Sequence, residues 1–299
     1  MTPSPSTSVC AVVVAYGNNN GIERCISALR DCSDVSVIVV VDNGGNRSVE
    51  LACRGLGAVY VDPGANVGYA RGVNLGVQSV NCSASHVLVV NPDVVLHDLA
   101  PVLLALDQSG AAVATGCLQR TDGSVDANIR ETATPIKEFG CAVFGTRVYA
   151  SPVPDLDGAV EAVEQAAGSL LLMTKNVWER LGGFDERFEL YYEDVDLCRR
   201  AGVLGGVVRV RTVVARHAGG ASFGTNRNQA YVALRVSRLR YLRKWHGPWG
   251  TVLGFLLTLI ELISRGATRQ GEGWRTRIAA VVEQAREISA PGAASTLDR

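Results

Sequence analysis

The first half of the chain alternates short apolar runs with segments whose apolar residues have helical spacing. The apolar runs, which are rich in β-branched residues, cover positions 9–15, 35–41, 58–61, 86–90 and 111–116. Such continuous runs are typical of strands buried on both faces of a sheet. Helical spacing covers positions 22–29, 48–54, 73–80 and 99–109. The alternation predicts an α/β fold with a mostly parallel, doubly wound sheet.

The second half of the chain is less regular. Glycines and a proline interrupt residues 119–149, and the later segments predict strands at 166–174, 206–210 and 213–216 and helices at 176–181, 228–246, 251–264 and 274–288. We therefore expect a disordered segment at 1–8, an α/β domain at 9–225, a helical region at 226–289 and a disordered tail at 290–299.

Composition and charge narrow the class of protein. The 299 residues are 47% hydrophobic and 19% charged, which is ordinary for a globular protein. Lys and Arg together number 29 and are balanced by 29 Asp and Glu, so no nucleic-acid partner is expected. No secretory signal precedes Val9, and the apolar run at 252–260 is too short to span a bilayer. The eight cysteines form no CxxC pair, which favours reduced thiols and a cytoplasmic location.

Polar residues follow the predicted strands, where ligands bind in open α/β sheets. Tyr16 follows the first strand, and Asp42 and Asn43 follow the second. Asn91-Pro92-Asp93 follows the fourth strand, where one carboxylate and a phosphate could share Mg²⁺ or Mn²⁺. A simple turn is the alternative at both acidic positions.

The segment Asn66-Val67-Gly68-Tyr69-Ala70-Arg71-Gly72 is a glycine-rich start to a helix. Its glycines permit close backbone approach, its free N–H groups suit an anion, and Arg71 adds a cation. An ordinary loop before a helix is the alternative. The first strand is followed by neither G-x-G-x-x-G nor a P-loop, which argues against a dinucleotide dehydrogenase and a P-loop ATPase.

A second acidic group lies within residues 182–202, GGFDERFELYYEDVDLCRRAG. If a helix begins at Glu193, its first-turn acids are at the positive end of the helix dipole. The aromatic residues before it imply that Glu193 and Asp194 are partly desolvated, as a general base requires. An acidic helix start with salt bridges, such as Asp196 to Arg200, is the alternative.

In this order, the motifs resemble the family 2 glycosyltransferases of the GT-A fold, particularly their bacterial rhamnosyltransferase-like branch. The matching segments are VVVAYGNNNGIERCISAL, VIVVVDNGG, NVGYARGVNLGV, VLVVNPDVVL, GSLLLMTKNVWERLGGFDERFELYYEDVDLCRRAG and HAGGAS, from Val9 to Ser222. The fold implied is a GT-A Rossmann-like sheet with a C-terminal helical extension.

The resemblance implies a role for each candidate residue. Those expected at the nucleotide sugar are Tyr16, Asp42, Asn43, Asn66, Gly68, Arg71, Asn91 and Asp93. Within this group, Asp42 would contact the base of the nucleotide and Arg71 would lie near the diphosphate. Asp93 stands where the family's D-x-D motif ends, although Asn91 replaces its first acid and leaves a single carboxylate. Asp93 and His217 would hold Mg²⁺ or Mn²⁺. Asp194 matches the catalytic base, supported by Glu193 and Asp196.

The activity implied is inverting transfer of a sugar, with deoxythymidine-diphosphate rhamnose as the expected donor. The acceptor would be a glycan, a glycolipid or a small-molecule aglycone. A nucleotidyltransferase and a non-catalytic nucleotide-sugar-binding module are the alternatives. The basic residues of 228–244 and the apolar residues of 252–263 suit peripheral contact with the inner face of the plasma membrane. A packed helical layer or a homodimer contact would use the same residues.

Overall fold

The computed structural model describes residues 7–17, 21–80, 84–126, 128–131, 133–144, 155–218, 227–266 and 281. The strands are β1 (Val9–Ala15), β2 (Val35–Asp42), β3 (Val59–Val61), β4 (His86–Val90), β5 (Val94–Leu96), β6 (Val113–Arg120), β7 (Ile129–Arg130), β8 (Val160–Val163), β9 (Gln165–Ala166), β10 (Leu170–Thr174) and β11 (Val207–His217). The helices are α1 (Ile22–Asp31), α2 (Arg47–Leu56), α3 (Tyr69–Ser79), α4 (Ala100–Ser109), α5 (Pro135–Phe144), α6 (Lys175–Leu181), α7 (Glu193–Ala201) and α8 (Arg227–Gly266).

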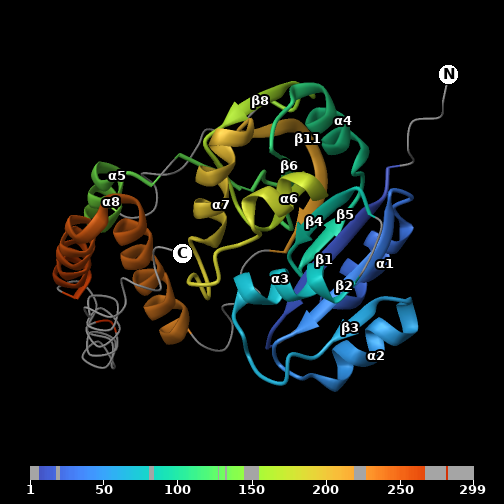
Figure 1. Cartoon of the computed structure of the whole chain (residues 1–299), viewed down its shortest axis with the longest axis horizontal. Coiled ribbons are helices and arrows are strands. Elements are labelled where there is room, and N and C mark those ends of the chain that lie inside the picture. Colours follow the sequence, from blue (N-terminus) through green and yellow to red (C-terminus); the bar gives the residue numbers. More distant parts are fainter. Residues whose placement is uncertain are drawn as a thin grey trace.

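One mixed sheet forms the centre of the molecule (Figure 1). Its strand order is β3-β2-β1-β4-β10-β6-β11-β5, and β8 pairs with β11 outside this path. Strands β1 to β4 are parallel, as is the pair β6 and β11. β10 runs antiparallel between β4 and β6, while β5 and β8 run antiparallel to β11. The α/β class and the parallel N-terminal half predicted from the alternating pattern are confirmed.

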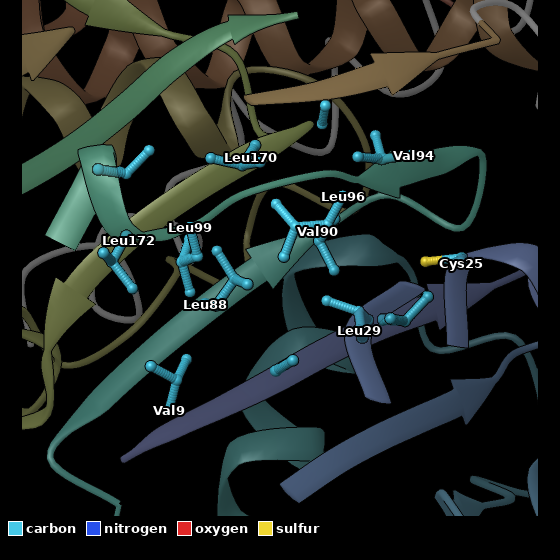
Figure 2. Close-up of a cluster of buried hydrophobic side chains, with 14 of the residues drawn as sticks. Val9, Cys25, Leu29, Leu88, Val90, Val94, Leu96, Leu99, Leu170 and Leu172 are labelled. Carbon is cyan, nitrogen blue, oxygen red and sulfur yellow. The ribbon is translucent and has the colours of Figure 1, made fainter. Parts of the chain in front are cut away.

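Helices cover both faces of the sheet because β1 is apolar on both. Val9, Ala11 and Val13 belong to a buried cluster with residues of α1, α2 and α4, part of which Figure 2 shows. Cys10 and Val12 belong to the opposite cluster with residues of α3, α6 and α7. A strand that packs helices on both sides needs apolar side chains at successive positions, which explains the continuous run.

Several boundaries differ from the predicted ones. The two short strands expected at 206–216 form one strand, β11, whose pairing with β6 shifts register between Val210 and Ala215. Helix α5 lies within the segment expected to be irregular. Helix α3 begins at Tyr69, four residues early, after Gly68 with φ 85°. The expected disorder at 290–299 and most of the helix expected at 274–288 lie outside the described residues.

The C-terminal helix α8 packs against α5 at one end of the molecule (Figure 1). It is two helices separated by a kink at Gly247, whose φ is 65°, followed by Pro248. A buried apolar cluster joins α5 and α8 to Phe188 and to Val195 of α7. In the described residues, no helix has the length and apolarity needed to cross a membrane.

Candidate active site

The loops that follow β1, β2 and β4 lie in contact at the carboxyl edge of the sheet. A Cβ on Gly21, before α1, would lie 3.1 Å from the Pro92 carbonyl oxygen, next to Asp93. A Cβ on Gly44, after β2, would lie 3.5 Å from the Gly17 nitrogen. This is the edge of the sheet at which the sequence analysis predicted the ligand site.

Asp42 and Asn43 are buried and build the loop after β2. Asp42 accepts hydrogen bonds from the Gly44 N–H at 3.0 Å, the Asn46 N–H at 2.5 Å and the Tyr60 hydroxyl at 3.2 Å. Asn43 donates from Nδ2 to the Gly68 carbonyl at 3.0 Å. Asp42 therefore makes the turn that was its alternative reading. Its contact with a nucleotide base stays a prediction.

The other residues predicted to bind the sugar nucleotide are less buried than Asp42 and Asn43. Tyr16 has 51% of its surface exposed, which leaves its ring accessible. Asn66 accepts the Gly68 N–H at 3.0 Å and so shapes the start of α3. Arg71 is exposed, and its Nε lies 3.8 Å from a carboxylate oxygen of Glu186. Its role at a diphosphate also stays a prediction.

Asp93 and His217 lie together, and a second acid holds the histidine. His217 Nε2 is 3.4 Å from Asp93 Oδ1, and Nδ1 is 2.6 Å from Asp126 Oδ2. Asp126 in turn binds Arg120 at 2.7 Å. Burial lowers the pKa of His217, but hydrogen bonds to Asp126 and Asp93 outweigh it and raise the pKa to about 9. The two carboxylates therefore favour a positive charge at the position between them.

These residues fit a cation that is shared with a ligand. No group of three possible metal-ligating side chains occurs among the described residues. Mg²⁺ and Mn²⁺ nevertheless need only one or two protein ligands when phosphate oxygens and waters fill the other positions. The carboxylate at Nδ1 also orients Nε2 of His217 toward Asp93, and a metal ion bound there would displace the proton that Nε2 carries when the site is without metal.

Tyr69 connects this side of the site to the second acidic group. Its hydroxyl donates to Asn91 Oδ1 at 3.1 Å and to the Gly168 carbonyl at 3.0 Å. The Gly168 N–H donates to Asp194 Oδ2 at 2.9 Å. Burial and then the charges of Glu193, Asp194 and Asp93 raise the pKa of Tyr69 well above its usual value, so all three carboxylates lie near this phenol.

Helix α7 begins at Glu193, which is the condition under which its first-turn acids lie at the positive end of the helix dipole. Glu193 is 5% exposed, and its Oε2 has no hydrogen-bond partner among the described residues. Burial and the neighbouring Asp194 raise its pKa well above the usual value, which favours the neutral acid. Asp194 differs because both of its oxygens accept backbone N–H groups, from Gly168 and Val195. Asp194 is therefore the better placed of the two to act as a base.

Asp196 is fully buried, and its contacts serve to hold the fold together. It pairs with Arg200 at 2.7 Å and with Lys244 of α8 at 2.6 Å. It also accepts the indole N–H of Trp245 at 3.0 Å. The Asp196–Arg200 salt bridge expected from the spacing is confirmed, and Asp196 ties α7 to α8.

The order of the motifs has a match among known families. The family model described as "Glycosyltransferase like family 2" matches residues 5–235, more than three quarters of the chain. The chain belongs to glycosyltransferase family 2.

Relatives of this glycosyltransferase share 24–28% of aligned residues with it. The low-salt glycan biosynthesis hexosyltransferase Agl10 of Haloferax volcanii is 25% identical over 64% of this chain, which spans only 60% of that relative. Rhamnosyltransferase WbbL of Escherichia coli is 24% identical, over 79% of this chain and 93% of the relative. The N-acetylglucosaminyl-diphospho-decaprenol L-rhamnosyltransferase of Mycobacterium tuberculosis is 28% identical, over 87% of this chain and 94% of the relative.

Two solved structures share the fold of the glycosyltransferase at low identity. The mannosyltransferase PcManGT of Pyrobaculum calidifontis, in complex with GDP-Man and Mn²⁺, superposes with a TM-score of 0.54 at 13% identity, over 97% of this chain and 82% of that one. TarS residues 1–349 of S. aureus superpose with a TM-score of 0.52 at 11% identity, over 97% and 83%. The GT-A fold expected from the sequence is confirmed.

Sequence reasoning missed several residues that contact the predicted site residues. Tyr69 lay inside a quoted motif, yet nothing local indicated that its hydroxyl reaches Gly168, 99 positions away. Asp126 carried no signal because its partner His217 is 91 positions away. Tyr60 lies within a short predicted strand that contains no polar motif. Only contacts across the folded sheet reveal these side chains.

Proposed function

We propose that this protein is an inverting glycosyltransferase that moves a sugar from a nucleoside diphosphate to an acceptor hydroxyl. The observation that carries the proposal is the connection from Asn91 through Tyr69 and Gly168 to Asp194. It links the Asp93–His217 pair, where positive charge is favoured, to the Asp194 carboxylate, which would take a proton. Sugar transfer requires both at one carbon, the positive charge for the leaving group and the base for the acceptor hydroxyl.

The proposed step uses Asp194 as a general base. The acceptor hydroxyl loses its proton to the Asp194 carboxylate while its oxygen bonds to the anomeric carbon of the sugar. The bond from that carbon to the diphosphate breaks, and the leaving nucleoside diphosphate keeps the electron pair. Attack from the face opposite the leaving group inverts the configuration, so no covalent enzyme intermediate forms.

The opposite side of the site stabilises the leaving group. Asp93 and His217 would hold Mg²⁺ or Mn²⁺, which when bound would offset the negative charge that develops on the diphosphate. Asp126 keeps His217 oriented toward Asp93 at this position. The Mn²⁺ complex of PcManGT supports the use of a divalent ion in this fold.

The relatives support a donor and an acceptor class. Two are rhamnosyltransferases, which favours deoxythymidine-diphosphate rhamnose as the donor. The mycobacterial name specifies a lipid-linked sugar diphosphate, which supports a cell-surface glycan intermediate as the acceptor. Membership in a glycosyltransferase family disfavours the nucleotidyltransferase alternative.

Peripheral membrane contact belongs to the same proposal. The second half of α8 exposes Trp249, Val252, Leu256 and Leu259 at helical spacing, which suits insertion into a lipid interface. Co-sedimentation with anionic phospholipid vesicles would show this contact. If the protein instead forms a soluble dimer and does not bind the vesicles, this face is a homodimer contact.

A thermal-shift panel of nucleoside diphosphates and their sugars, with and without Mn²⁺, tests the donor class. We expect the largest stabilisation from one nucleoside diphosphate and its sugar, and only with the metal. Release of free nucleoside diphosphate from that sugar nucleotide, without acceptor, tests catalysis. Binding without any release would instead support a non-catalytic nucleotide-sugar-binding module.

A further inference from the structure

The turn before the acid pair has an unfavourable backbone conformation. Tyr191 and Tyr192 have φ of 67° and 65°, in the left-handed region that residues other than glycine rarely adopt. Glu193 and Asp194 follow directly, so this turn sets where α7 begins and where its first carboxylates point. Such a conformation persists only when surrounding contacts fix it.

A buried contact from another helix fixes Tyr192. Its hydroxyl donates to Oε1 of Glu138, in α5, at 2.6 Å. The Glu138 side chain is only 2% exposed, and its Oε2 lies 3.7 Å from the Arg238 guanidinium of α8. Arg238 is held by Thr258 at 2.9 Å and by Glu261 at 3.4 Å, also in α8. A buried carboxylate with a fixed cation is a rigid acceptor for the phenol.

Helix α8 also holds the loop that leads into this turn. Ser237 Oγ donates to the Leu190 carbonyl at 2.8 Å, and Arg240 donates to the Arg187 carbonyl at 2.7 Å. On its other side, this loop accepts the Tyr69 N–H at the Glu189 carbonyl, at 2.6 Å. The loop therefore lies between α8 and the start of α3.

We infer that Glu138 and Tyr192 are positioning residues, through which the α5–α8 layer fixes the orientation of Asp194. The inference rests on the proposed role of Asp194 as the base. It also gives the basic residues of α8 a function: Arg238 acts inside the protein, on the turn that carries the acid pair.

The contacts predict which kinetic constant responds. Loss of the Tyr192–Glu138 bond frees the strained turn to relax, and the Asp194 carboxylate then moves from its place beside Gly168. Small displacements of a catalytic group cost up to about 100-fold in rate. We expect kcat to fall about tenfold or more. The KM for the donor should change less than threefold, because Asp93, in the turn before β5, and His217, at the end of β11, belong to other elements of the fold.

The experiment compares three variants in hydrolysis of deoxythymidine-diphosphate rhamnose with Mn²⁺, with water as the acceptor. Tyr192→Phe keeps the ring against Tyr241 but loses the donor, so kcat should fall. Glu138→Gln keeps an acceptor for the phenol and should retain most of kcat. Tyr241→Phe is the matched control, because it removes a buried hydroxyl of the same cluster, the acceptor of Arg199 at 3.0 Å, while leaving the Tyr192–Glu138 bond in place.

Hydrogen exchange gives a readout that needs no turnover. The N–H groups of Gly168 and Val195 both donate to Asp194. They should lose protection in Tyr192→Phe and keep it in Tyr241→Phe. Unchanged protection in Tyr192→Phe, or equal losses of kcat in both variants, would overturn the positioning role. Absence of hydrolysis by the wild-type protein would refute the proposed function alone, because the exchange result still decides the inference.

Discussion

The two acidic groups of the site differ in how their charge is compensated. Asp93 and Asp126 lie on either side of His217, and Asp126 also binds Arg120. By contrast, none of the ion pairs formed within the described part of the chain includes Glu193 or Asp194. The first group has cations beside it, and the second has backbone N–H groups and aromatic rings.

This difference indicates what each side can do. A carboxylate that is paired with positive charge stays ionised and can share a cation with a phosphate. A carboxyl that is buried beside another carboxyl, with no ion-pair partner among the described residues, favours its neutral form. This is the environment of Glu193, whose Oε2 has no hydrogen-bond partner in that part of the chain, whereas Asp194 accepts two backbone N–H groups.

The strongest test of the comparison is Asp194→Asn. The amide cannot take the acceptor's proton, so transfer should fall by about 10²- to 10⁴-fold. Binding of the nucleoside diphosphate should stay within a few-fold, because its charge is met at Asp93 and His217. Calorimetry paired with a transfer assay measures both. Asp31→Asn, an exposed carboxylate at the end of α1, is the control. Retained activity would exclude Asp194 as the base.

Asp93→Ala should act on the opposite side. Loss of the only acid in Asn91-Pro92-Asp93 should weaken Mn²⁺-dependent binding of the nucleoside diphosphate about tenfold or more, the size of a hydrogen bond to a charged group. Binding without Mn²⁺ should change little. Titration calorimetry with and without the ion separates the two. Equal affinity of variant and wild type in Mn²⁺ would count against a metal role for Asp93.

Asp126→Asn tests whether the compensation itself matters. The amide can still contact His217 Nδ1, but the negative charge that orients and polarises the imidazole is lost. Changes in such supporting groups cost about 10- to 100-fold in metal affinity. We expect the lower end, measured as the Mn²⁺ concentration that half-saturates donor hydrolysis. Asp122→Asn, an exposed acid in the same loop, is the control and should change nothing.

Glu193→Gln should have the smallest effect on activity, within a few-fold, because the amide resembles a carboxyl that is already neutral. Its effect on stability should depend on pH. The raised pKa means that the folded chain keeps a proton which the unfolded chain releases above its usual pKa of about 4.3. Wild-type stability should therefore fall, relative to the variant, between pH 5 and pH 8.

Denaturant unfolding at both pH values measures this difference. A constant difference would mean that Glu193 is ionised in the folded protein. A loss of turnover greater than 100-fold would assign the base to Glu193 instead of Asp194.

The helix α8 shows the limit of reading charge from sequence. Its basic residues suggested an anionic surface, yet Arg235 and Arg238 are buried and bind Glu261. Lys244 binds Asp185 and Asp196. Hydrogen bonds from Arg187 and Lys244 overcome the effect of burial and hold the pKa of Asp185 well below its usual value. These contacts match the packed helical layer that was the alternative.

The sequence by itself determined the α/β class and the strands β1 to β4 of the N-terminal sheet. These depend on local patterns, because a strand buried on both faces must be apolar at successive positions. Only the tertiary structure decided which carboxylate has a cation beside it and which has none among the described residues. Asp126, Gly168 and Glu138 contact the site across 91, 26 and 54 positions of chain. Such partners are chosen by packing, and no local spacing encodes them.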